Sequence, residues 1–313
     1  MKILHRLEDF TFDGPVVLTQ GTFDGIHLGH QKILKRIVNE AKKSHAKSVL
    51  LTFYPHPRLV LYPDDNELKL LTTLHEKSDW LREFGLDYLI VLPFTKELSR
   101  LEPYEFVKML NSHLNITKFI IGYDHRFGKN REGDIDDLME YAKIFEFEVE
   151  EISRHDIDDC KVSSSTIRTS ILEGNIVLAG KLLGRRFALT GQVIHGEKRG
   201  TKLGYPTANI RQTDSYKISP ATGVYAVCVK LYSTDQVLGG MMNIGTKPTF
   251  GNGEVNMEVN IFDFTADLYG QEITIEFVDR LRDEIKFANV DGLIHQLKID
   301  EANARNLLKN VCA

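Results

Sequence analysis

The sequence contains few cysteines and no excess of positive charge, and each absence excludes a class of protein. Its three cysteines, Cys160, Cys228 and Cys312, are far apart and lack the paired spacing of zinc sites or disulfide frameworks. We therefore expect reduced thiols. The formal net charge of -5 provides no overall basic field of the kind that nucleic-acid-binding proteins use. Anionic ligands must then be bound by local groups.

Long apolar runs are also missing. The first ten residues, MKILHRLEDF, lack the apolar stretch of a signal peptide, and no later run has the length that crosses a bilayer. The sequence predicts a cytoplasmic protein with neither a membrane nor a nucleic-acid partner. It also contains no internal repeat and no low-complexity linker.

The first half of the chain alternates short apolar runs with stretches of helical periodicity. This alternation is typical of an α/β domain with a Rossmann-like, doubly wound parallel sheet, which binds ligands at the carboxyl ends of its strands. At 313 residues the chain is long enough for two domains. The expected strands cover residues 15–20, 48–54, 87–94 and 118–124.

The second half has a different pattern, with alternating strands separated by glycine-rich turns at 223–232, 255–264 and 271–281. It predicts an antiparallel β-barrel, and residues 291–310 have the apolar spacing of a terminal helix packed on it. Gly184 can end a helix just before the pattern changes. We therefore predict two domains, residues 1–183 and 184–313.

The stretch GTFDGIHLGH, from Gly21 to His30, places His27 and His30 between an apolar strand and a helical stretch. A helix N-terminus offers unpaired N–H groups and partial positive charge, and glycines allow a phosphate to approach the backbone closely. The alternative is that the histidines only cap the helix. A metal site is disfavoured because no third ligand has suitable spacing.

Two further stretches of the first half carry anion-binding groups. GYDHRFGKNREGD, which follows the strand at 118–124, contains Asp124, Arg126, Lys129 and Arg131, and VSSSTIR contains a serine run followed by Arg168. Imidazoles, hydroxyls and guanidinium groups together suit a triphosphate whose α-phosphate is attacked. The serine run has a plainer alternative as a helix cap.

GTFDGIHLGH resembles the HxGH signature of the nucleotidyltransferases. With TFYPHPR, GYDHRFG and VSSSTIR it is similar to the FMN adenylyltransferase domain of bacterial bifunctional FAD synthetases. The resemblance implies that His27 and His30 contact the ATP phosphates and stabilise charge on the leaving pyrophosphate. It implies ATP or phosphate binding by Gly21, Phe23, Asp24, Ser163, Ser164, Ser165 and Arg168, and a flavin or nucleotide loop containing Pro55, His56, Pro57, Asp124, Arg126 and Phe127.

This chain departs from that family pattern at two positions. His125 occupies a position where the family usually has Phe, and Ser165 replaces a Thr. The first change can alter flavin or adenine packing. The second keeps the hydroxyl and loses a methyl group.

The resemblance continues into the second half, where GTKLGYPTANI, GVYA, NIGTKPTFG and MEVNIFDF are similar to the riboflavin kinase module in the same order. HGEKRGTKLGYPTAN is a basic, glycine-containing loop that can close over phosphates, although a solvated turn has the same composition. The resemblance implies that Thr207 and Asn209 bind magnesium. It implies ATP or phosphate binding by Gly196, Lys198, Gly200, Lys202, Gly204, Pro206, Thr207 and Asn209.

Glu258 is the residue that we predict to be the base of the kinase reaction. Met257, Val259 and Ile261 alternate with Asn256, Glu258 and Asn260, so a strand would place the carboxylate on the polar face. A surface glutamate would show the same pattern. The family match implies that Glu258 takes the proton of the ribityl 5′-hydroxyl as it attacks the γ-phosphate.

These features predict a bifunctional, magnesium-dependent enzyme that converts riboflavin to FMN at the barrel and FMN to FAD at the sheet domain. ATP, riboflavin and FMN are the expected small-molecule partners. Two alternatives remain open: an enzyme with kinase activity only, and a flavin-binding carrier or regulator without turnover.

Overall fold

The computed structural model describes residues 1–64, 68–153, 162–196, 200, 203–234, 236–246 and 255–312 of the chain. They form two compact units, Met1–Ser164 and Ser165–Ala313. Lys198, Lys202 and Cys160, which the sequence analysis singles out, lie outside the described residues.

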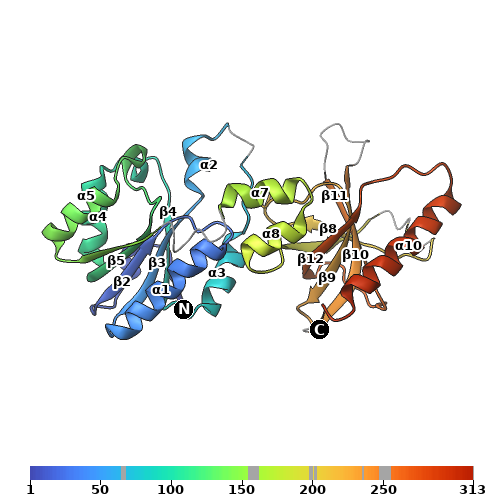
Figure 1. Cartoon of the computed structure of the whole chain (residues 1–313), viewed down its shortest axis with the longest axis horizontal. Helices are drawn as coiled ribbons and strands as arrows, with labels where there is room; N and C mark the ends of the chain where they lie inside the picture. Colours follow the sequence, from blue (N-terminus) through green and yellow to red (C-terminus); the bar gives the residue numbers. More distant parts are fainter. Residues whose placement is uncertain are drawn as a thin grey trace. The chain divides into compact units, whose positions relative to one another are not determined.

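The first unit contains a six-stranded parallel sheet with the strand order β1-β4-β3-β2-β5-β6 (Figure 1). The predicted doubly wound sheet is therefore confirmed, and all four predicted strands are present. The strands are β1 Lys2–Leu4, β2 Val16–Gln20, β3 Lys47–Tyr54, β4 Tyr88–Pro93, β5 Ile116–Gly122 and β6 Glu148–Ile152.

Helices cover both faces of this sheet, because alternate strand residues point to opposite faces and both sets are apolar. Val17 and Leu50 pack with α1 and α3, whereas Leu18 and Leu51 pack with α4 and α5. The helices of the unit are α1 Leu28–Lys43, α2 Pro57–Leu61, α3 Leu74–Glu83, α4 Pro103–His113 and α5 Ile135–Phe145, with short 3-10 turns η1 Leu7–Asp9, η2 Leu98–Arg100 and η3 Lys129–Arg131.

The strand order reverses next to β2. The chain runs from β2 outward to β3 and β4, and β5 then returns to pair with the other side of β2. Ligands of doubly wound sheets bind at such a switch point, beyond the carboxyl ends of the strands. GTFDGIHLGH follows β2 and GYDHRFG follows β5, so two of the predicted site stretches meet at this switch point.

The second unit is built around a closed antiparallel barrel with the order β10-β11-β8-β7-β12-β9. The predicted barrel is confirmed. Gly184 ends α8 in a left-handed conformation, as predicted. The elements are α7 Ser164–Leu172, α8 Ile176–Leu183, β7 Ala188–Ile194, β8 Ala208–Gln212, β9 Gly223–Leu231, β10 Gln236–Thr246, β11 Val255–Ile261, β12 Glu272–Arg282 and α10 Val290–Leu308.

The predicted terminal helix is α10, which packs against β9, β10 and β12 (Figure 1). This packing explains why both faces of β9 are buried. Ala226 and Cys228 lie under α10 with Ala304 and Leu308, whereas Tyr225 on the opposite face packs against Phe277 of β12.

The prediction of three reduced thiols is wrong for two of them, because Cys228 and Cys312 form a disulfide. Cys228 lies on the β9 face under α10, and the chain beyond α10 returns to the same place, where the Cα atoms are 5.5 Å apart. This separation is ordinary for a disulfide. The two cysteines are 84 positions apart, so sequence spacing alone could not reveal the pairing.

Candidate active sites

The two histidines of the first unit form a compact pair at the start of α1. His27 is the N-cap residue, and its Nδ1 accepts a hydrogen bond from the His30 N–H at 3.4 Å. The two rings are stacked, with centroids 3.7 Å apart, and Phe23 packs on His30 at 4.7 Å. His27 is thus a helix cap, and the pair also sits where the helix N-terminus attracts an anion.

The backbone that leads to these histidines is unusual. Phe23, Gly25 and Ile26 have φ angles of 45°, 82° and 39°, all in the left-handed region. Outside glycine such conformations cost about 1 to 3 kcal/mol each, and they persist only where surrounding contacts hold them. The β-branched Ile26 is a particularly unfavourable residue for this conformation. We call residues 22–30 the histidine turn.

The contacts that hold the histidine turn come mainly from the segment that leads into α3. The Asp24 carboxylate, in a residue only 3% exposed, accepts hydrogen bonds from the N–H groups of Leu71 and Thr72 at 3.0 to 3.2 Å. The Thr72 hydroxyl accepts the Gly25 N–H at 3.1 Å. The Ser164 hydroxyl donates to the Asp24 carbonyl at 3.0 Å. Asp24 therefore anchors the turn internally.

The loop after β5 contains three of the residues that are predicted to bind a flavin or nucleotide. Asp124 is exposed at its start, which leaves its side chain accessible to a ligand. Arg126 donates to Asp134 at 2.9 Å, and Asp134 caps α5. Phe127 is buried in the core beside Phe106. The loop is thus held by the burial of Phe127 and by the ion pair between Arg126 and Asp134.

His125, one of the two departures from the family pattern, occupies an aromatic environment. Its ring lies 6.2 Å from that of Phe119 and 5.8 Å from that of Phe127. Its Nε2 is buried, with no hydrogen-bond partner among the residues that the structure describes. Burial, assisted by the charge of Arg131, lowers the pKa of His125 to about 4. The imidazole is therefore neutral at pH 7 and packs as a phenylalanine would.

The remaining predicted residues of the first site lie on two other segments. Gly21 follows β2 directly, and a Cβ there would press against the Phe23 ring. Pro55, His56 and Pro57 connect β3 to α2, where His56 Nδ1 accepts the Arg58 N–H at 3.2 Å. Ser163 precedes α7, Ser164 begins it, and Ser165 and Arg168 lie within its first two turns, in the second unit.

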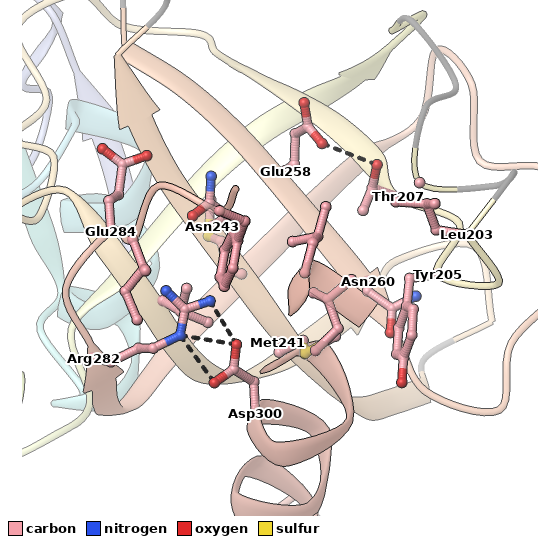
Figure 2. Close-up of a pocket in the computed structure, with 17 residues that line it drawn as sticks. Leu203, Tyr205, Thr207, Met241, Asn243, Glu258, Asn260, Arg282, Glu284 and Asp300 are labelled. Atoms are coloured by element: carbon pink, nitrogen blue, oxygen red, sulfur yellow. Dashed lines mark hydrogen bonds and ion pairs between the residues drawn. The ribbon is translucent and has the colours of Figure 1, made fainter. Parts of the chain in front are cut away.

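The barrel unit contains a cavity of about 320 Å³. Its polar lining residues include Thr207, Glu258 and Asn260 (Figure 2). Its apolar lining residues include Val224, Met241, Leu293 and Leu297. A large, mostly apolar cavity with a few polar groups is typical of a small-molecule site. The apolar and polar lining residues suit a ligand with an apolar ring and a polar tail.

Glu258 is held at the polar part of this cavity by both of its oxygens. The Thr207 hydroxyl donates to Oε2 at 3.2 Å (Figure 2), and the Asn256 side chain donates to Oε1 at 2.8 Å. Asn209 of β8 is the register partner of Glu258. Met257, Val259 and Ile261 are buried and Asn256 and Glu258 are half-buried, as the predicted alternation requires, whereas Asn260 is buried as well.

These polar groups fit a magnesium ion. The Thr207 hydroxyl, the Glu258 carboxylate and the carboxamide of Asn209 are oxygen donors, which hard cations prefer. Thr207 and Glu258 already lie within hydrogen-bonding distance of each other, and Asn209 lies opposite Glu258 in the barrel. The sequence predicts Thr207 and Asn209 as the metal ligands and Glu258 as the base, and these roles stay predictions.

Glycines shape the segment that leads to this site. A Cβ at Gly196 would overlap the side-chain amide of Asn209, and one at Gly200 would overlap the Tyr205 carbonyl. Gly204 has a φ of 82°, and the Pro206 carbonyl accepts a 2.7 Å hydrogen bond from Asn260. Gly196 therefore allows the backbone to approach the Asn209 side chain closely, and Gly200 allows it to approach the Tyr205 carbonyl.

An ion pair that the sequence analysis missed lies at the other end of the cavity. Arg282 of β12 binds Asp300 of α10 through two nitrogens at 2.7 to 3.0 Å (Figure 2), and Gln296 donates to the same carboxylate at 2.9 Å. The Asp300 side chain is only 2% exposed. The sequence feature that could have revealed this pair is the carboxylate of Asp300 on the apolar face of the predicted helix.

A doubly wound sheet with a histidine turn at its switch point, followed by a closed barrel with an oxygen-lined cavity, defines a two-domain nucleotide-dependent transferase. Residues 10–166 match the FAD synthetase family, and residues 183–308 match the Riboflavin kinase family. The chain belongs to the family of bifunctional riboflavin kinase/FMN adenylyltransferases.

Relatives of this family are similar over nearly their whole length. The bifunctional riboflavin kinase/FMN adenylyltransferase of Listeria monocytogenes serovar 1/2a is 39% identical, covering 92% of this chain and 91% of the relative. That of Bacillus subtilis (strain 168) is 37% identical, covering 94% and 93%.

A solved structure described as a macrolide-efflux protein from Streptococcus pneumoniae has a similar fold. It superposes with a TM-score of 0.89 and 35% identity over 97% of this chain and 98% of that one. Among the helices that the structure describes here, none is both long and apolar enough to cross a membrane.

Proposed function

We propose that the chain makes FAD from riboflavin in two ATP-dependent steps, with riboflavin kinase activity in the barrel unit and FMN adenylyltransferase activity in the sheet unit. Membership of the bifunctional family supports both activities. The single observation that supports the kinase site best is the cavity in which an apolar wall meets Glu258 and Thr207.

In the kinase step, Glu258 accepts the proton of the riboflavin 5′-hydroxyl. The hydroxyl oxygen forms a bond to the γ-phosphorus of ATP, the bond from that phosphorus to the β,γ-bridging oxygen breaks, and ADP leaves. Hydrogen bonds from Thr207 and Asn256 keep the carboxylate oriented. Thr207 and Asn209 would hold a magnesium ion, which would neutralise phosphate charge.

In the adenylyl transfer, a phosphate oxygen of FMN attacks the α-phosphorus of ATP. The bond to the α,β-bridging oxygen breaks, and pyrophosphate leaves. His27 and His30, stacked at the N-terminus of α1, stabilise the charge that develops on the departing group. The histidine turn offers N–H groups beside them. The assignment of Ser165 and Arg168 to phosphate binding stays a prediction.

Chromatography of a reaction containing purified protein, riboflavin and ATP tests this function. FAD and ADP are the expected products. FMN without FAD would favour the kinase-only enzyme, and riboflavin that is bound but unchanged would favour a carrier or regulator. A parallel reaction without magnesium, with chelator added, should give neither product if both steps require the metal.

We propose a domain boundary after residue 183, since α8 ends at Gly184 and β7 begins at Ala188. The compact units divide earlier, after Ser164, because α8 packs against β12. Fragments 184–313 and 165–313 separate these possibilities. A folded 184–313 fragment that phosphorylates riboflavin supports our boundary, whereas activity confined to 165–313 moves it to Ser164.

The cytoplasmic location and the lack of a nucleic-acid partner stay predictions.

A further inference from the structure

Lys77 of α3 is a buried lysine whose side chain contacts the first residue of the histidine turn. The residue is 8% exposed, and its Nζ donates a 2.6 Å hydrogen bond to the Thr22 carbonyl. A capping box between Thr73 and Glu76 fixes the first turn of α3 and therefore the position of Lys77. A buried ammonium is costly unless hydrogen bonds or opposite charges compensate it, so its position requires an explanation.

Asp24 is the acidic residue whose charge acts on Lys77. Burial lowers the pKa of the Lys77 ammonium, and the nearby Asp24 charge opposes that change. Asp24 is itself held by the N–H groups of Leu71 and Thr72. One short segment, residues 71–77, therefore binds the histidine turn at Thr22 through Lys77, at Asp24 through backbone donors and at Gly25 through Thr72.

The turn needs such contacts because its backbone is strained. Thr22 directly precedes Phe23, the first of the three residues with positive φ. A longer hydrogen bond from the Thr52 hydroxyl, 3.4 Å, is the other contact at the Thr22 carbonyl that we identify in the described residues. Losing the short bond from Lys77 removes the stronger restraint at the entry to the turn, and the positions of His27 and His30 depend on that turn.

We propose that Lys77 is a positioning residue for adenylyl transfer, which holds the Thr22 carbonyl and, with Asp24, fixes the histidine turn in its reactive conformation. The inference rests on the proposed adenylyltransferase activity of this unit. If Lys77 only stabilised the core, its replacement would lower the stability of the whole sheet unit and leave a normal turnover number in the folded enzyme.

The test compares Lys77→Met with Lys77→Arg and with Lys118→Met in the full chain. Lys118 of β5 is a matched control, because its side chain is also largely buried in the same unit and pairs with Glu40, Glu148 and Glu150 away from the turn. FAD formation from FMN and ATP is measured with KM for both substrates, and riboflavin phosphorylation on the same preparation checks the other unit. Hydrogen exchange of residues 21–30 reports the turn directly.

We expect Lys77→Met to lower kcat for FAD formation by about 10- to 100-fold, because small misplacement of catalytic groups has effects of this size. KM should change by less than about 3-fold, because the substitution does not remove a contact that binds the substrate and the transition state equally. Lys77→Arg, which keeps a charged donor, should recover part of the rate. Exchange should accelerate within residues 21–30, with Lys118→Met and the kinase reaction unchanged.

A normal kcat in folded Lys77→Met would overturn the proposal, as would exchange that accelerates equally across the sheet unit. If Lys77→Met does not fold, Lys77→Gln replaces it, and a normal kcat with unchanged exchange in that variant also overturns the proposal. If wild-type protein makes no FAD, the proposed function fails, whereas local acceleration of exchange in residues 21–30 would still support the anchoring of the turn by Lys77.

Discussion

The two units hold their reactive groups in different ways. In the sheet unit, His27 and His30 sit after a strained loop, and contacts from a segment about 50 positions away hold that loop. In the barrel unit, Glu258 sits in the middle of a strand, and its neighbours Thr207 and Asn256 hold its oxygens. A loop site depends on distant anchors, whereas a strand site depends on the register of the sheet around it.

Replacing Glu258 by Gln tests the strand site and should have the largest effect. The amide keeps the shape and cannot accept the proton, so FMN formation should fall by about 100- to 10,000-fold, with FAD formation from supplied FMN unchanged. Rates of both half-reactions, with thermal melting, measure this. Glu272→Gln, an exposed carboxylate at the start of β12, is the control. A folded Glu258→Gln that makes FMN at the normal rate removes this residue from the mechanism.

Replacing both His27 and His30 by Ala tests the loop site. FAD formation should fall by about 100- to 1,000-fold, because donors aimed at the leaving group are lost, and FMN should accumulate. Helix capping alone predicts a different result, a stability loss of about 1 kcal/mol with a normal rate. His113→Ala, at the end of α4, provides the control for loss of an imidazole. Product ratios and denaturant midpoints distinguish the two outcomes.

Reducing the Cys228–Cys312 disulfide tests whether the units differ in stability as well as chemistry. The bond closes a long loop of the barrel unit, so its loss should lower the free energy of unfolding of that unit by about 4 kcal/mol. Urea unfolding with and without dithiothreitol, and with Cys228→Ser, measures this. Cys160→Ser controls for loss of a thiol outside the pair. An unchanged barrel transition on reduction would show that the bond does not stabilise this unit.

The loss of stability that comes from protonation of His125 should affect the sheet unit and is the smallest effect. The pKa of His125 is lowered to about 4 in the folded state, so the unfolded chain binds more protons at acidic pH. Neutral His125 contributes fully to the free energy of unfolding above pH 6.5. This contribution decreases as the pH falls towards 4, by at most about 3 kcal/mol.

His125→Phe provides the comparison for this effect, because it keeps the aromatic packing between Phe119 and Phe127 and removes the titration. Unfolding free energies of both proteins are measured from pH 7 to pH 4. The variant should lose less stability than the wild type over this range. Parallel curves for the two proteins would show that His125 is not the group responsible.

Much of the fold was predictable because its signals are local. Apolar runs and helical spacing identified the parallel strands and the barrel strands, since each pattern lies within one element. Glu258 could be placed on the polar face of β11 for the same reason. The histidine turn was identified from its glycines and its place between a strand and a helix. The roles of the individual residues at both sites stay predictions.

The tertiary structure alone decided which distant residues meet. It placed Lys77 and Thr72 under the histidine turn, joined Arg282 to Asp300, and brought Cys228 to Cys312 against the expectation of reduced thiols. The sequence determined the elements, because periodicity and turn chemistry act within a few neighbouring residues. Only the folded chain determined these contacts, because they depend on strand order and on how helices pack between elements far apart in the sequence.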